Sequence, residues 1–147
     1  MAAGAWTFYN ISKKKLMDGT IDLDTNTFRM SLYTSASNAA TLTLSTRTSV
    51  SNEVTEQFGY SSSGKPLASV TWAAGASATE WRFNCAAIVW TASGGSISNV
   101  KFAVIWQSSG VADKLVCFSQ LSTAQFTVTS GNTLTITPSA NGIFELN

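Results

Sequence analysis

The feature that most constrains the fold is a stretch of alternating side chains at residues 100–107. Its large apolar residues fall on one side of an extended backbone, because strand side chains alternate with period two: Val100, Phe102, Val104 and Trp106. The other side carries Ala103 and Ile105 between two polar residues, which indicates that both faces are covered in the middle. Glycine and serine residues bracket the stretch. We therefore expect a core strand of about eight residues, paired on both edges.

Composition indicates an all-β protein of one domain. The chain has 147 residues, a length that fits a single domain with its own core. Charged residues make up only 12%, so serine, threonine, asparagine and glutamine must form much of the surface. Threonine favours strands and serine favours turns. Short strands joined by polar loops are the expected result.

Further strands are predicted where the alternation recurs between turn residues. Residues 20–33 are predicted to form two strands, or one long strand, around a turn at residues 24–27. The other predicted strands lie at residues 68–72, 81–85, 86–90, 115–118, 126–128, 134–136 and 143–146. Roughly seven to nine short strands with turns between them are typical of a sandwich or a barrel.

Residues 7–18 are predicted to form a short helix that ends at Gly19. Phe8, Ile11 and Leu16 lie near one helical face, and Tyr9 lies with the lysines mostly on the other. The lysines near the C-terminal end complement the helix dipole: Lys13, Lys14 and Lys15. A solvated helix end explains them simply, and a patch for an acidic partner is the alternative.

Residues 34–66 lose any regular period and form a long polar segment. Scattered apolar residues interrupt it, among them Phe58 and Tyr60 on either side of a glycine. Such a long loop in a compact domain is uncommon unless it carries function, is disordered alone or contains short elements. We predict that residues 34–66 and the N-terminal segment, residues 1–19, are partner-binding arms.

The sequence shows no pattern for catalysis or for cofactor binding. Histidine is absent, which excludes Ser-His and Cys-His pairs and histidine metal ligands. Glu53 and Glu56 are spaced for one helical face, and an exposed turn explains them better. Residues 22–33 begin like a calcium loop but lack its glycine and its last glutamate. We predict that the chain is not an enzyme and binds no cofactor, metal or small-molecule substrate.

Charge and cysteine usage narrow the class of partner. A net charge of +1 gives no electrostatic reason to bind nucleic acid or a membrane. There is no apolar run of about eighteen residues, and the first residues lack the features of a signal peptide, so we expect a soluble chain that stays where it is made. Cys85 and Cys117 sit in apolar strand-like runs, which predicts buried thiols rather than a disulfide.

Aromatic residues are the positive signal for binding. The chain has five tryptophans. Four lie in predicted strands and are assigned to core packing: Trp72, Trp81, Trp90 and Trp106. Aromatic residues near a chain end are costly to leave in water and are common interface anchors, so we predict partner binding by Trp6, Phe8 and Tyr9. With them we group Lys13, Lys14, Phe58 and Tyr60.

Several segments together resemble small virion proteins of tailed bacteriophages. The segments are LMDGTIDLDTNTFRMSLYTS at residues 16–35, VSNEV at residues 50–54, the Gly59-Tyr60 pair and ISNVKFAVIW at residues 97–106. Among these virion proteins the chain is similar to the capsid cement, or head decoration, proteins of short-tailed phages. The resemblance covers residues 8–106 and the C-terminal strand.

This resemblance implies a jelly-roll-like antiparallel β-sandwich on the capsid exterior. A cement protein ties neighbouring major capsid subunits together, so the expected partners are the major capsid protein and neighbouring copies of this chain. The expected localisation is the virion, after synthesis in the host cytoplasm. Two alternatives stay open: a tail or fibre module, and a carbohydrate-binding β-sandwich in which Trp72 or Trp81 faces solvent as a platform.

Overall fold

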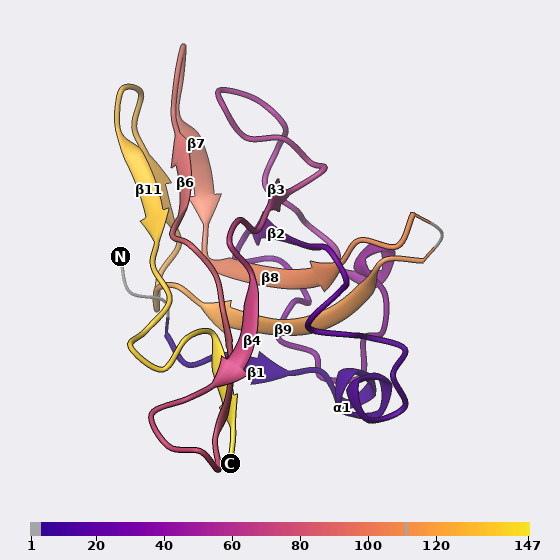
Figure 1. Cartoon of the computed structure of the whole chain (residues 1–147). Coiled ribbons are helices and arrows are strands. Elements are labelled where there is room, and N and C mark those ends of the chain that lie inside the picture. The colour runs from indigo at the N-terminus through magenta and orange to yellow at the C-terminus, as the bar shows by residue number, and fades with distance from the viewer. Residues whose placement is uncertain (1–3, 111) are drawn as a thin grey trace.

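The structure is a computed structural model that describes residues 4–110 and 112–147. It is an antiparallel, sandwich-like all-β fold with one short α-helix, as the sequence predicts (Figure 1). In chain order the elements are β1 (Thr7–Phe8), α1 (Asn10–Met17), β2 (Phe28–Tyr33), the 3-10 helix η1 (Arg47–Ser49), β3 (Lys65–Pro66), β4 (Thr71–Ala74), β5 (Trp81–Asn84), β6 (Ile88–Thr91), β7 (Ile97–Val100), β8 (Phe102–Gln107), β9 (Lys114–Gln120), β10 (Phe126–Val128), β11 (Thr133–Ile136) and β12 (Phe144–Leu146).

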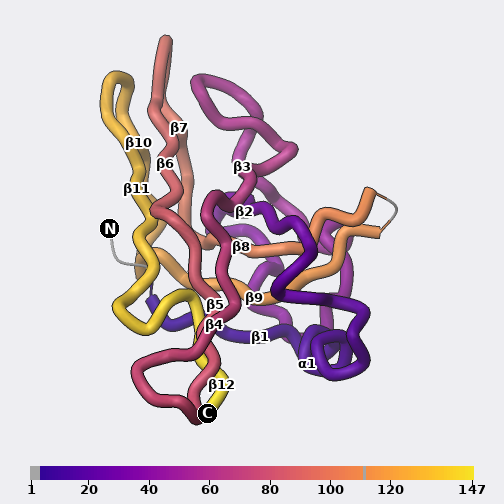
Figure 2. Tube along the Cα trace, in the orientation of Figure 1, coloured from indigo at the N-terminus to yellow at the C-terminus, as the bar shows by residue number. Residues whose placement is uncertain are grey.

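The strand pairs are nested around β8 and β9. These two strands pair with each other, and outward from them β7 pairs with β10, β6 with β11 and β5 with β12, all antiparallel. Two arms of one long hairpin therefore run side by side and bend together, which Figure 2 shows in the trace. A folded double arm of this kind is the arrangement of a jelly roll.

The strand β8 is the centre of the molecule. It lies between β2 and β9, and all six of its residues are buried. Ala103 and Ile105 face the main core, whereas the side chains on the other face enter a second cluster: Phe102, Val104 and Trp106. The predicted core strand, paired on both edges and covered on both faces, is confirmed for these residues.

The predicted strand is wrong at its first two residues. Val100 belongs to β7 and to the main core, so it does not share a face with Phe102. Asn99 has a φ of +63°, in the left-handed region. Lys101 lies between the end of β7 at Val100 and the start of β8 at Phe102. Alternation cannot continue through that bend, and the chain changes its partner from β10 to β9.

The segment before β2 also differs from the prediction. Ile21 and Leu23 are buried, but residues 21–27 form turns instead of a first strand. The Asp22 carboxylate accepts hydrogen bonds from the backbone N–H of Asp24 at 2.9 Å and from the Thr25 hydroxyl at 2.7 Å. Such side-chain bonds to nearby groups compete with strand pairing.

The helix is shorter than predicted. It begins at Asn10, because residues 7–8 form β1 and pair with β9. Its predicted end is confirmed, since Gly19 has a φ of +76°, which residues other than glycine adopt only rarely.

We predict that Val104→Asp abolishes folding. Val104 is buried in β8, and an unpaired carboxylate there costs several kcal/mol, a large part of the roughly 5–15 kcal/mol that stabilises a typical domain. Circular dichroism and urea unfolding measure the effect. Leu42→Asp is the control, because Leu42 is 40% exposed and the variant should keep the native spectrum. A cooperatively folded Val104→Asp protein would contradict the central position of β8.

Candidate functional site

The predicted anchor Tyr9 is a core residue. It is completely buried, its hydroxyl donates to the carbonyl of Ala39 at 2.7 Å, and its ring lies 5.4 Å from that of Phe118. Burial also raises the pKa of the Tyr9 phenol well above its ordinary value. Tyr9 therefore cannot contact a partner in this structure, and its prediction as an exposed anchor is corrected.

Trp6 and Phe8 are half-buried against the main core. The Phe8 ring meets that of Phe144 edge-on at 4.5 Å, and its backbone pairs with β9. The residues around Phe8 are thus part of the fold, because their backbone pairs with β9 and their side chains pack against the main core. Residues 1–3 of the predicted arm lie outside the described residues.

The lysines of α1 remain at the surface as predicted. Lys13 and Lys14 are exposed, and Lys14 makes an ion pair with Asp18 at 3.0 Å one turn later. Lys15 is partly covered, and this burial, followed by the nearby charge of Lys114, lowers its pKa. Lys13 therefore presents its charge to solvent on the helix.

The segment of residues 34–66 is anchored by three side chains, which we call the Arg47 cluster: Arg47, Glu53 and Tyr60. Arg47 pairs with the Glu53 carboxylate at 3.0 Å, donates to the carbonyl of Ser62 and lies over the Trp106 ring at 4.7 Å. The Tyr60 hydroxyl donates to Glu53 at 2.6 Å. The long segment is therefore tied to the β2–β8 sheet at the middle of its length.

Burial sets the electrostatics of the Arg47 cluster. It raises the pKa of Glu53, against the opposing effects of the Tyr60 hydrogen bond and the Arg47 charge. Burial and the Glu53 charge also raise the pKa of Tyr60. Tyr60 is a buried residue whose hydroxyl accepts the backbone N–H of Leu32 at 3.0 Å, so its prediction as a partner-binding residue is corrected.

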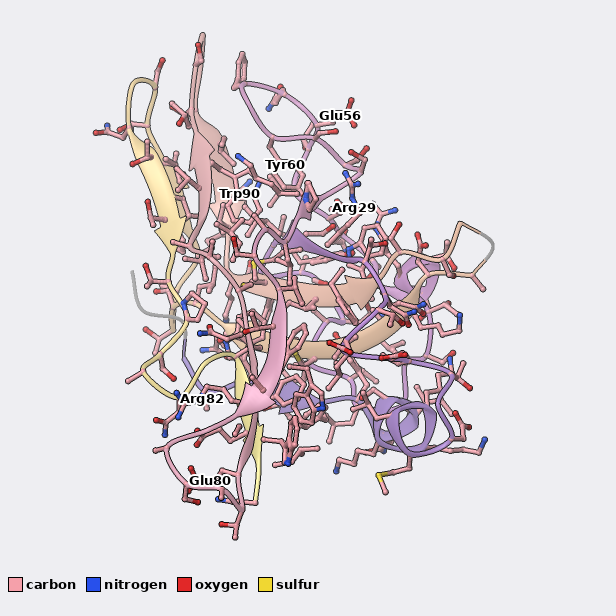
Figure 3. The ribbon with its side chains drawn as sticks, viewed as in Figure 1. Arg29, Glu56, Tyr60, Glu80, Arg82 and Trp90 are labelled. Carbon is pink, nitrogen blue, oxygen red and sulfur yellow. The ribbon has the colours of Figure 1, made fainter. Side chains whose placement is uncertain are left out.

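Phe58, unlike Tyr60, stays available to a partner. It is 39% exposed and has a φ of +52°, which is unusual for an aromatic residue. Its ring lies against Gly95, where an added Cβ would collide with it, and its carbonyl accepts the backbone N–H of Ser93. The strained turn is thus held on the loop between β6 and β7. Figure 3 places the nearby Tyr60 in the upper part of the molecule.

The structure reveals an apolar surface that the sequence indicated only in part, through the alternative in which Trp72 or Trp81 faces solvent. Three of the five large hydrophobic residues that are exposed in the described part of the chain gather there: Met17 at 85%, Trp81 at 47% and Leu146 at 43% exposure. Trp81 and Leu146 are cross-strand partners, and Met17 and Leu146 line one groove with the half-buried Trp72. We call Met17, Trp72, Trp81 and Leu146 the apolar surface. It lies at the lower end in Figure 1, where α1 and the C-terminus are found.

The tryptophan assignments divide between the core and this surface. Trp90 and Trp106 are buried, as predicted. Trp81 is exposed, and its ring centroid lies 5.8 Å from that of Trp72 at an interplanar angle of 33°. The assignment of Trp81 to the core is therefore wrong, because β5 extends beyond the residues that could cover its apolar face.

Both cysteines are free and buried, as predicted. Burial raises the pKa of the Cys85 thiol to about 11 and that of Cys117 well above its usual value, so both thiols stay protonated at neutral pH.

Within residues 4–110 and 112–147, no group of three or more acidic or cysteine side chains is placed to hold a metal ion. In the same part of the chain, no helix has the length and apolar character needed to span a membrane. No family model, curated protein or solved structure matches the chain.

We predict that Tyr60→Phe lowers the free energy of unfolding by about 1–3 kcal/mol, because it leaves the buried Leu32 N–H without an acceptor and leaves the Glu53 carboxylate with Arg47 but without its tyrosine donor. Tyr33→Phe is the matched control. The buried Tyr33 hydroxyl lies near Glu53 and Arg47 but makes no hydrogen bond of normal geometry among the described residues, so its removal should change stability by less than about 1 kcal/mol. Urea unfolding measures both. Equal losses in the two variants would contradict the role of the Arg47 cluster.

Proposed function

We propose that the protein is a structural virion protein that binds the outer surface of a bacteriophage capsid and stabilises contacts between major capsid subunits. The apolar surface is the observation that carries the proposal. Contiguous exposed apolar side chains on a folded domain mark an interaction site, because water contact with them is unfavourable until a partner covers them. The class of partner follows from the sequence resemblance to cement proteins.

The arrangement of exposed apolar residues suits a protein that joins two neighbours. Met17, Trp81 and Leu146 lie at the end that carries α1 and β12, whereas Phe58 contacts the loop between β6 and β7 at the other end (Figure 1). Two separated contact points allow one domain to touch two capsid subunits. Many copies on a symmetric shell would then add avidity to individually small contacts.

The proposal includes no catalytic, cofactor-dependent or nucleic-acid-binding activity. It places the protein on the capsid exterior after synthesis in the host cytoplasm. Binding to a tail or a fibre is the alternative within the virion, and a particle with labelled protein only on its tail would favour it.

Carbohydrate binding is the second candidate function, because Trp81 is exposed and lies beside Trp72. Aromatic faces at a surface can stack on apolar faces of a sugar ring, as they do on other planar ligands. A change in tryptophan fluorescence on titration with glycans would support this candidate, and an unchanged spectrum would argue against it.

We predict that the purified protein sediments with capsid shells that lack it and fails to sediment with shells that already carry it. The second preparation is the control, because its sites are occupied while the shell is otherwise the same. Quantitative gel analysis of the pellet measures the bound copies. Absence of binding to the undecorated shells would exclude the capsid role.

A further inference from the structure

The three-stranded sheet of β4, β5 and β12 has an apolar face that continues beyond the core. The strand register places Phe83 opposite Phe144 and, two residues along, Trp81 opposite Leu146. Residues two apart in a strand share a face, so all four belong to one face. Phe83 and Phe144 are buried in the main core, whereas Trp81 and Leu146 emerge into solvent. The chain itself covers only half of this face.

The opposite face of the same sheet carries a partly buried ion pair. Arg82 and Glu145 stand across from each other in the register, with the Arg82 Nε 2.8 Å from a Glu145 carboxylate oxygen. Figure 3 labels Arg82 and Glu80 in this lower part of the molecule. β5 and β12 thus place charged residues on one face and apolar residues on the other, and the exposed Trp81 and Leu146 mark a surface that a partner can cover.

A groove beside this face can receive a side chain. It has a volume of about 330 Å³, and its walls are largely carbon, including Leu16, Met17, Ile21, Trp72 and Leu146. Methionine is flexible and adapts its shape to different apolar partners. Asp22 also lines the groove, but its carboxylate already accepts bonds from its own turn. Such a lining offers little hydrogen bonding to a sugar and suits an apolar side chain.

A positive charge stands beside the groove on the same side of α1. Lys13 and Met17 are four residues apart, so they are neighbours on the helix surface, and both are exposed. Lys14 is already paired with Asp18, and the described structure gives Lys13 no ion pair. An exposed lysine next to apolar residues favours a partner that carries a carboxylate beside its own apolar side chain.

We propose that the apolar surface, with Lys13 at its rim, is the capsid-docking surface, and that it receives an apolar side chain of the partner protein with a carboxylate next to it. Met17, Trp81 and Leu146 cover the apolar side chain, and Lys13 meets the carboxylate. This inference rests on the proposed capsid function and assigns that function to one face of the molecule.

The test compares affinities for undecorated capsid shells. Met17→Ser and the double variant Met17→Ser with Trp81→Ser should each bind more weakly than the wild type, the double variant by tenfold or more. Lys13→Glu should weaken binding at low salt, and its difference from the wild type should shrink at high salt. Leu42→Ser is the matched control, since Leu42 is an exposed apolar residue of the loop after β2 and should bind like the wild type.

The outcomes separate the docking surface from the function. Circular dichroism checks that each variant is folded. If Trp81→Ser unfolds the protein, Met17→Ser alone still tests the surface, because Met17 is almost fully exposed and its replacement should not disturb the core. If the wild type binds the shells and both Met17→Ser and Lys13→Glu bind equally well, the assigned docking surface is wrong, but the proposed capsid function still stands. Absence of wild-type binding would remove both. If the protein self-associates and Met17→Ser abolishes this, the surface binds a second copy of the chain and the inference is overturned. A glycan-induced change in Trp81 fluorescence would overturn it too, because the surface would then bind a sugar.

Discussion

The burial of β8 on both faces is the constraint on which the rest of the structure depends. Ala103 and Ile105 contact the main core, and Phe102, Val104 and Trp106 fill the second cluster on the other side. A strand covered on both faces must be paired on both edges, since its backbone groups have no access to water. β2 and β9 supply that pairing, and the nested strand pairs then extend outward from β8 and β9.

The second cluster needs a cover, and residues 34–66 provide it. Ala39, Val50 and Leu44 of this segment contact the cluster formed around Val104 and Trp106. The Arg47 cluster holds the segment in place through an ion pair, a cation over an indole ring and a tyrosine hydrogen bond. A long polar stretch without period is thereby fixed by a few buried polar contacts, whose loss costs more than that of similar contacts in water.

The sequence predicts local pattern well and distant contacts poorly. Alternation correctly identified the buried residues of β8, and Gly19 correctly marked the end of the helix. The buried positions of Tyr9 and Tyr60 could not be predicted, because their hydroxyls bond to Ala39 and Leu32, which are 30 and 28 residues away. The residues that follow Tyr9 and Tyr60 in the sequence are largely polar, as they are around surface residues, so local pattern does not mark these tyrosines as buried.

The apolar surface escaped prediction for a related reason. Period two shows that Trp81 and Phe83 share a face, but it does not show where along the strand the core ends. The sequence offered two partial signals: Met17, close behind three lysines in α1, and the alternative in which Trp72 or Trp81 faces solvent. The bend at Asn99 was equally hidden, because asparagine adopts the left-handed conformation only where its surroundings require it.

Apolar contact dominates the proposed docking. Covering one side chain the size of leucine or methionine contributes about 1.5–3 kcal/mol, whereas an exposed ion pair such as one made by Lys13 contributes about 0–1 kcal/mol. Met17, Trp81 and Leu146 would therefore supply most of the affinity, and Lys13 would orient the partner. A reconstruction of the decorated particle tests this arrangement most directly. The proposal predicts that α1 and β12 face the capsid shell, and a protein whose α1 and β12 point into solvent would contradict it.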